Sequence, residues 1–164
     1  MELELKRGGR TARVETLGGE LVSYRDERGL EYIWGGDPAY WPGRNPLLFP
    51  IVGMLKEGKI RFDGREYAME RHGFARRREF TPAARGEDWV RLELRESAET
   101  LALYPYPFRL AVEQRLTDTG FSTAVTVSSL TMGSGLSGIF RYLALVFPQA
   151  VPYMAVFYVT AWWM

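Results

Sequence analysis

The stretch GKIRFDGREYAME, residues 58–70, gives the clearest indication of the fold. Two runs of alternating apolar and polar residues flank the pair Asp63-Gly64. This pair favours a tight hairpin, because both turn positions of such a hairpin need a positive φ angle. We therefore predict two antiparallel strands joined by this turn.

The same alternation recurs on both sides of the hairpin. Before it stand residues 2–6 (ELELK), 12–17 (ARVETL) and 20–26 (ELVSYRD), with Gly18-Gly19 as a turn; after it stand 88–96 (DWVRLELRE) and 108–127, with a turn near Asp118 to Gly120. No window of helical period and length competes with these runs. We expect an all-β fold, an antiparallel sandwich or barrel.

Length and composition limit the possible number of domains, partners and kinds of site. A chain of 164 residues fits one domain, and 25% charged with 46% hydrophobic residues is ordinary for a globular protein. A net charge of +1 gives no general electrostatic case for nucleic acid as a partner. The absence of cysteine and the single histidine exclude disulfides and histidine-rich zinc sites. The start, MELELKRGGR, lacks a signal-peptide pattern, so the expected location is the cytoplasm.

The sequence changes character near Met132. Residues 132–164 carry one charge, Arg141, and residues 142–164 carry none. The uncharged segment is long enough to span a bilayer, but the two prolines and the glutamine within 148–152 are unfavourable in a membrane-spanning helix. Three interpretations are open: a buried terminal segment, a membrane anchor, or residues read in the wrong frame after a lesion in the gene.

Residues 34–53, WGGDPAYWPGRNPLLFPIVG, form a non-repeating run rich in glycine, proline and aromatic residues. One interpretation is a structured loop that leads into a buried strand at 47–52. The other is a sugar platform, because flat aromatic faces stack on sugar C–H faces while Asn45 or Arg44 bonds to hydroxyls. Composition alone favours the loop.

His72, the single histidine, lies in RHGFARRREF, residues 71–80. A lone histidine is usually structural. However, Gly73 allows a ligand to approach the backbone closely, and Arg71 and Arg76 supply fixed donors for oxygen-rich ligands. Histidine is also the natural acid–base residue near neutral pH. The local sequence leaves both interpretations open.

Other polar residues carry weaker signals. Arg77 and Arg78 are predicted to lie at a solvated edge, since strand alternation turns at least one of them outward. The carboxylates between residues 66 and 96 are predicted to form the solvent face of alternating strands, because none stands in a pattern that singles out a general base. P-loop, dinucleotide-binding and nucleophile-elbow motifs are absent from the sequence.

The order of these pieces resembles the aldose 1-epimerase (galactose mutarotase-like) family. The resemblance rests on NPLLFPIVG at 45–53, the KxGK hairpin that follows it, and HGFAR at 72–76, and it covers residues 1 to about 128. It implies an antiparallel β-sandwich of the mutarotase-like supersandwich type, in agreement with the strand pattern. It also implies interconversion of the α and β anomers of a free aldose, without metal or cofactor.

The family chemistry gives roles to individual residues. One group protonates the sugar ring oxygen while another takes the proton from the anomeric hydroxyl, so an acid and a base must be held across one sugar. By resemblance, His72 helps to hold the sugar at the reacting centre. Arg76 resembles a substrate-binding arginine, as does Arg71. With Asn45 and Arg44 as further contacts, these residues form the expected site.

The sequence also departs from the family pattern. Met54 stands where the family often has a basic residue. The family's second histidine, the usual general acid, and its later glutamate base have no counterpart here, and the chain has roughly half the family's length. Because the resemblance stops near Ser128, where composition changes, we expect residues 1–128 to be the N-terminal half of the sandwich, incomplete at the C-terminus. Residues 129–164 are then an apolar tail from a frameshift or truncation.

Three functional hypotheses follow. The first is a mutarotase-like protein that binds a hexose or hexose phosphate but has little epimerase activity by itself, because the proton-transfer pair is missing. The second is a non-catalytic carbohydrate-binding module that uses the same contacts. The third is a membrane-anchored β domain with residues 142–164 as the anchor. The apolar tail also allows self-association as a further expectation.

Overall fold

The computed structural model describes residues 1–129 and the backbone of two further strands at 139–146 and 157–160. One sheet contains β1 (Glu2–Arg7), β2 (Arg10–Glu15) and β3 (Glu20–Arg25) in the order β1-β2-β3. A second has the order β11-β10-β9-β8-β7-β6 and consists of β6 (Thr81–Arg85), β7 (Trp89–Arg95), β8 (Phe108–Leu116), β9 (Phe121–Ser129), β10 (Ile139–Val146) and β11 (Phe157–Thr160). A separate hairpin pairs β4 (Lys59–Phe62) with β5 (Arg65–Ala68).

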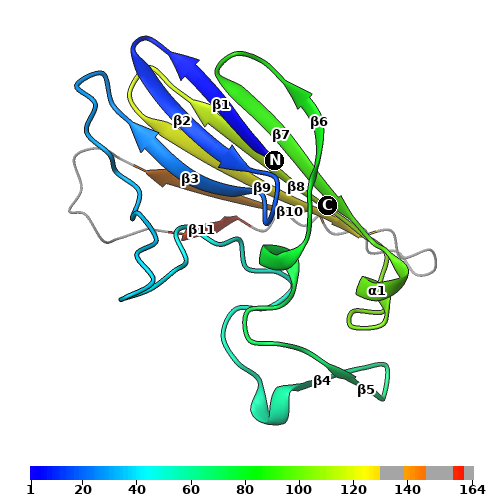
Figure 1. Cartoon of the computed structure of the whole chain (residues 1–164). Helices are drawn as coiled ribbons and strands as arrows, with labels where there is room; N and C mark the ends of the chain where they lie inside the picture. Colours follow the sequence, from blue (N-terminus) through cyan, green and yellow to red (C-terminus); the bar gives the residue numbers. More distant parts are fainter. Residues whose placement is uncertain (130–138, 147–156, 161–164) are drawn as a thin grey trace.

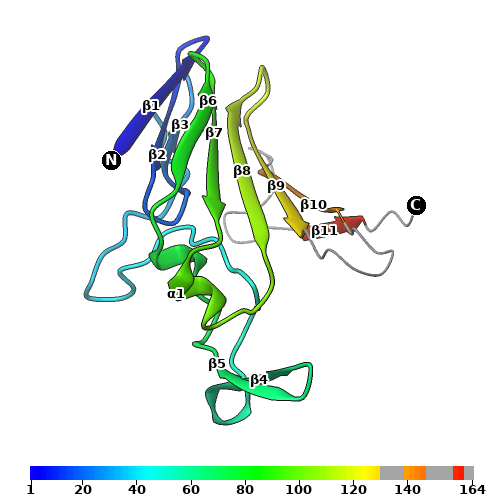
Figure 2. The ribbon, with the colours of Figure 1, turned by 90° about the vertical axis from the view of Figure 1, so that its right-hand side faces the viewer.

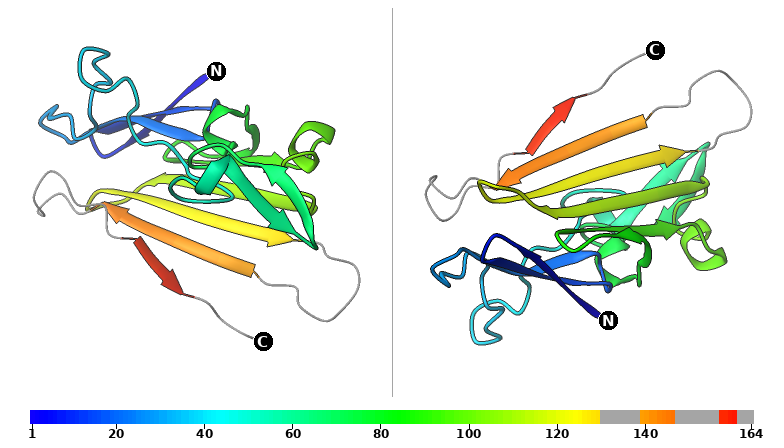
Figure 3. Two further views of the ribbon diagram at one scale, coloured as in Figure 1. Left: turned by 90° about the horizontal axis from the view of Figure 1, so that it is seen from below. Right: turned by 90° about the horizontal axis from the view of Figure 1, so that it is seen from above.

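The two larger sheets pack face to face, and the β4–β5 hairpin projects from one end of them (Figures 1 and 2). The views from below and from above in Figure 3 show β1–β3 as one layer and the strands of the second sheet as the other. Alternation explains the packing: Leu3 and Leu5 of β1 are buried while the glutamates between and beside them are exposed. On the facing sheet, Leu92 of β7 and Leu110 and Val112 of β8 are fully buried. The all-β antiparallel sandwich expected from the sequence is therefore confirmed.

The predicted hairpin is confirmed at its turn. Asp63 and Gly64 both have positive φ angles, 48° and 79°, and Phe62 pairs with Arg65. The other predicted strands also appear, with β1, β2, β3, β7, β8 and β9 falling on the alternating runs. The Gly18-Gly19 turn is confirmed as well, with φ angles of 73° and 62°.

One local expectation is wrong. Residues 47–52 form no strand; Phe49 makes one isolated bridge to Gly73, and Val52 is 78% exposed. Pro50 has no N–H group to donate to a ladder, so the apolar run packs its alternate side chains on the core without joining a sheet. The sequence analysis made no prediction for β6, whose Pro82 is tolerated since β6 is the edge strand of its sheet.

Three short helical turns also escaped the sequence analysis: η1 (Lys56–Gly58), η2 (Ala75–Arg77) and α1 (Ala98–Leu101). Each is too short to show a helical period. The α1 turn begins at a capping box, in which the Ser97 side chain accepts from the Thr100 N–H and the Thr100 side chain accepts from the Ser97 N–H.

Most of the apolar tail lies outside the described residues. Within the described part, β10 pairs with β9 from Ile139 opposite Ser128 to Val146 opposite Phe121, which extends the six-stranded sheet. The frameshift interpretation, self-association and the division at residue 128 stay predictions. Among the described residues, no helix is both long and apolar enough to cross a membrane.

Candidate functional site

Two hydrogen bonds join His72 to Gly53. The His72 N–H donates to the Gly53 carbonyl at 2.8 Å, and the Gly53 N–H donates to Nδ1 of the imidazole at 2.9 Å. A neutral ring that accepts at Nδ1 carries its proton on Nε2. Burial, and then the charges of Arg71 and Arg76, lower the pKa of His72 below its ordinary value of 6.5, which favours the neutral ring at pH 7.

The histidine stands on an unusual backbone turn. His72 and Gly73 both have left-handed φ angles, 68° and 69°. A Cβ atom on Gly73 would lie 2.1 Å from the Phe49 carbonyl oxygen, so only glycine fits there. The same oxygen accepts from the N–H groups of Phe74 at 2.9 Å and Ala75 at 3.2 Å. The segment at residue 49 therefore sets the position of the His-Gly pair through backbone contacts.

Arg71 and Arg76 complete a group with His72 that we call the histidine cluster. The Arg76 Nη2 group donates to the Arg71 carbonyl at 3.0 Å, and Arg71 Nε donates to His72 Nε2 at 3.2 Å. A neutral imidazole cannot accept at both nitrogens. The neutral ring can therefore satisfy the Gly53 N–H or the Arg71 Nε–H, but not both. An oxygen atom of a ligand beside Arg71 would supply the missing acceptor.

The neighbouring arginines have carboxylate partners, whereas those of the cluster have none among the described residues. Arg77 pairs with Glu70 at 2.5 Å, and Arg78 pairs with Glu99. Arg77 is exposed, so the predicted solvated edge is confirmed for it. Within residues 1–129, no carboxylate forms an ion pair with Arg71 or Arg76. The histidine cluster thus combines excess positive charge with several donors.

Arg44 and Asn45 form a second group on a separate segment. Their backbone N–H groups donate to Oε1 of Glu20, at 3.2 Å and 2.6 Å respectively. The Arg44 guanidinium lies 3.8 Å from the Glu15 carboxylate. The Asn45 side chain is exposed and has no hydrogen-bond partner among the described residues. Neither side chain contacts the histidine cluster in the described part of the chain, so the five predicted residues fall into two groups.

Aromatic side chains on the loop before Asn45 are exposed. Trp34, Tyr40 and Trp41 are 44%, 83% and 49% exposed. The Trp34 and Tyr40 rings lie edge to face at 6.4 Å, and the Trp34 indole N–H donates to the Trp41 carbonyl at 2.9 Å. The segment is a structured loop, as composition favoured, with partly exposed aromatic rings on its surface. Met54 is 78% exposed beside Gly53, close to the histidine cluster.

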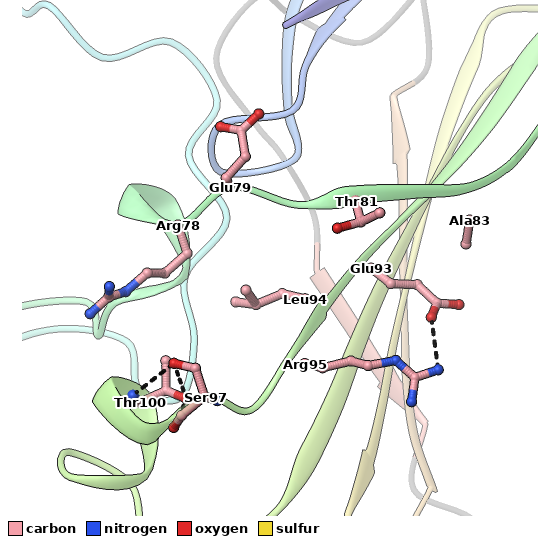
Figure 4. Close-up of a pocket in the computed structure, with 9 residues that line it drawn as sticks. All are labelled: Arg78, Glu79, Thr81, Ala83, Glu93, Leu94, Arg95, Ser97 and Thr100. Carbon is pink, nitrogen blue, oxygen red and sulfur yellow. Dashed lines mark hydrogen bonds and ion pairs between the residues drawn. The ribbon is translucent and has the colours of Figure 1, made fainter.

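A hollow of about 610 Å³ lies between β6, β7 and α1 (Figure 4). Its most buried charge, Glu93, accepts hydrogen bonds from Arg109 and from Arg95 at 3.4 Å, and the bond from Arg109 is the main reason that the pKa of Glu93 is lowered. Two of its hydroxyl groups, on Ser97 and Thr100, cap α1, and the third is on Thr81 of β6. None of the predicted site residues lines this hollow. We therefore place the candidate site at the histidine cluster.

Comparisons with known proteins identify the family. The aldose 1-epimerase family model matches residues 1–136, and the chain therefore belongs to the aldose 1-epimerase family. It is 38% identical over 135 residues to the plasmid-encoded LacX protein of Lactococcus lactis subsp. lactis, covering 79% of this chain and 45% of that protein. The chromosomal LacX of the same organism matches equally well, at 38% over 135 residues.

Solved structures agree with the fold. A galactose mutarotase-like protein from Lactobacillus casei ATCC 334 is similar with a TM-score of 0.78 and 28% identity, over 91% of this chain and 52% of that one. A galactose mutarotase related enzyme from Lactobacillus acidophilus gives a TM-score of 0.78 at 23% identity, over 92% of this chain and 51% of that one. The chain spans about half the length of the relatives it matches.

Sequence reasoning missed two residues that shape the site. Gly53, the last residue of the FPIVG motif, donates its N–H to Nδ1 of His72. Glu20 binds the backbone of the segment that carries Asn45. From the sequence, a glycine at the end of an apolar run such as Gly53 indicates only a turn. Nothing local signals Glu20, because its partners lie 24 and 25 residues further along the chain.

Proposed function

We propose that the chain binds an aldose, or an aldose phosphate, at the histidine cluster. The observation that carries this proposal is that Gly53 N–H and Arg71 Nε–H approach the two nitrogens of one imidazole, which in its neutral form can accept from only one of them. Sugars present many oxygen acceptors, and arginine is suited to bind them with fixed geometry. The membership of the aldose 1-epimerase family supports an aldose, and the names of the structural relatives suggest galactose as the first probe.

The cluster suits binding of the reacting sugar better than proton transfer to it. Protonation of the sugar ring oxygen needs an acid, and a neutral imidazole can donate a hydrogen bond to that oxygen but does not release its N–H proton near neutral pH. Removal of the proton from the anomeric hydroxyl needs a base on the other side of the sugar. The sequence has one histidine, and within residues 1–129 no carboxylate contacts the histidine cluster. We therefore propose that this chain alone binds sugar and catalyses epimerisation weakly.

Nuclear magnetic resonance provides a direct test of binding. The imidazole of His72 gives a single, unambiguous set of histidine signals, since the chain has no other histidine. Titration with galactose should shift these signals saturably. Arg76→Ala should weaken binding about tenfold or more, from the loss of hydrogen bonds by a charged donor. Arg77→Ala is the matched control, because Arg77 pairs with Glu70 outside the cluster.

A polarimetric assay separates an enzyme from a binding module. Each positioned acid or base contributes about 10²–10⁴ to the rate, so loss of one or both should leave the chain far slower than a complete epimerase. Rapid anomer equilibration that His72→Ala abolishes would contradict the impaired activity proposed here. Saturable binding without measurable equilibration would support a non-catalytic carbohydrate-binding module. No response to galactose, glucose or their 6-phosphates would refute the proposed site.

A further inference from the structure

The turn between β2 and β3, residues 16–20, contacts both segments of the candidate site. On one side it binds the segment that follows the histidine cluster. The Gly18 N–H donates to the Arg78 carbonyl at 2.8 Å, and the Phe80 N–H donates to the Thr16 carbonyl at 2.8 Å. Figures 1 and 2 show the end of β2 and the start of β3 next to η2, which carries Arg76.

Close packing and a buried hydrogen bond fix the position of this turn. A Cβ atom on Gly18 would lie 3.0 Å from the Arg76 carbonyl oxygen, so the two backbones are in tight contact. The next residue, Gly19, is bound from the opposite sheet, where the Gln114 side-chain amide donates to its carbonyl at 3.1 Å. Gln114 is 2% exposed. The turn is therefore anchored to the sandwich core on one side and to the cluster segment on the other.

On its other side the turn holds Arg44 and Asn45 through Glu20. One carboxylate oxygen of Glu20 accepts both backbone N–H groups, at 3.2 Å from Arg44 and 2.6 Å from Asn45. Within the described ranges, the amides of residues 43–48 donate to no backbone carbonyl. The Glu20 carboxylate thus accepts the hydrogen bonds of the Arg44 and Asn45 amides, which pair with no strand in the described residues.

We infer that Glu20 is a positioning residue that sets Asn45 at the correct distance from the histidine cluster. This inference rests on the proposed function and extends it, because it takes Asn45 to contact the same sugar that the histidine cluster binds. Glu20 suits the role because a carboxylate binds two adjacent N–H groups more strongly than a neutral acceptor does. It starts β3, so its backbone belongs to the rigid three-stranded sheet, and the same turn contacts the cluster segment. A single element therefore determines the spacing between the two groups.

Hydrogen exchange tests the contact without any sugar. Glu20→Ala removes the acceptor, and Glu20→Gln keeps one oxygen that can accept. In Glu20→Ala, the amides of Arg44 and Asn45 should exchange about tenfold faster or more, while in Glu20→Gln they should stay within about threefold of the wild type. Glu4→Ala is the control, because Glu4 lies on the same sheet with only a surface pair to Lys6.

Galactose affinity then tests the role in binding. Glu20→Ala should weaken binding about tenfold, and Glu20→Gln should restore most of the affinity. Asn45→Ala should weaken binding by a similar factor. If Glu20 acts through Asn45, adding Glu20→Ala to the Asn45→Ala chain should weaken binding by less than about twofold more. A purely structural role for Glu20 would instead give additive losses.

The outcomes separate the two proposals. If the wild type binds galactose and Glu20→Ala binds it equally well, the positioning role is wrong while the sugar site stands. Exchange rates at Arg44 and Asn45 that do not change in Glu20→Ala would also overturn it. If the wild type binds neither galactose nor its 6-phosphate, the proposed function fails, and the role of Glu20 in it fails too, whatever the exchange rates show.

Discussion

Replacement of Gly73 by alanine is expected to cost far more than an ordinary glycine substitution. The φ angle of Gly73 is 69°, and an alanine there has a penalty of about 1–2 kcal/mol for the left-handed conformation alone. The new Cβ would also lie 2.1 Å from the Phe49 carbonyl oxygen and 2.4 Å from the carbonyl carbon. These are backbone atoms, which cannot rotate away as the end of a side chain can.

The second contribution to the loss of stability comes from this steric contact with Phe49. Overpacking at a well-packed position costs about 1–3 kcal/mol, and here relief requires the Phe49 carbonyl to move. That movement strains the hydrogen bonds from Phe74 and Ala75 to the same oxygen. The free energy of unfolding of Gly73→Ala should therefore fall by about 2–5 kcal/mol in total. Urea denaturation followed by circular dichroism measures this change.

Gly64→Ala is the matched control for this prediction. Gly64 has a φ of 79°, but nothing lies within 4 Å of an added Cβ atom. The control should show only the conformational penalty of about 1–2 kcal/mol. The difference between the two variants isolates the contact with Phe49. Equal losses of stability in both would refute the reasoning that the 49–50 segment sets the position of the His-Gly pair.

Three further predictions concern the site and its support. The His72 ring signals should titrate with a pKa below 6.5. Galactose affinity should be constant above the pKa of His72 and fall as the pH drops through it, because a protonated Nδ1 cannot accept from Gly53. An affinity that rises on acidification would contradict this prediction. Galactose 6-phosphate should bind more tightly than galactose at low ionic strength, since Arg71 and Arg76 have no carboxylate partner in the described residues. The difference in affinity between the two sugars should become smaller as salt is added. Isothermal titration calorimetry at several salt concentrations measures both affinities. Gln114→Leu should lower the free energy of unfolding by about 1–3 kcal/mol in a urea titration, because the Gly19 carbonyl loses its hydrogen-bond donor. Thr123→Val is the comparison, because the Thr123 hydroxyl donates to the same Gln114 side chain. A smaller loss of stability in Gln114→Leu than in Thr123→Val would count against the anchoring role of Gln114.

Much of the fold could be predicted because its strands have one buried face. In β1 the alternation of buried and exposed residues follows the alternation in the sequence, and the Asp63-Gly64 turn is set by local φ requirements. In β7 the apolar positions Val90, Leu92 and Leu94 are buried as the pattern predicts, but Glu93 between them is buried too. The failures lie where local signals conflict. At residues 47–52 hydrophobicity predicts a strand, but Pro50 lacks the donor that a ladder needs. In β6 the same residue type, Pro82, is tolerated because the strand lies at an edge.

The candidate site was predictable only where its members are neighbours in sequence. Arg71, His72 and Arg76 stand within six positions of one another, and the structure brings them into contact. The position of Asn45 relative to them depends on Glu20, whose contacts arise from tertiary packing. No periodicity or spacing in one sequence encodes such a contact. The two groups of site residues therefore became visible only in three dimensions.

The order of the strands has a consequence for how the chain folds. In each described sheet, every strand pairs only with strands that are adjacent to it along the chain, as in β1-β2-β3 and β6 through β11. Such hairpins have low contact order and are expected to form early, including during synthesis. The link between Gln114 and Gly19, by contrast, joins residues 95 positions apart. Docking of the two preformed sheets is thus the step expected to limit the folding rate.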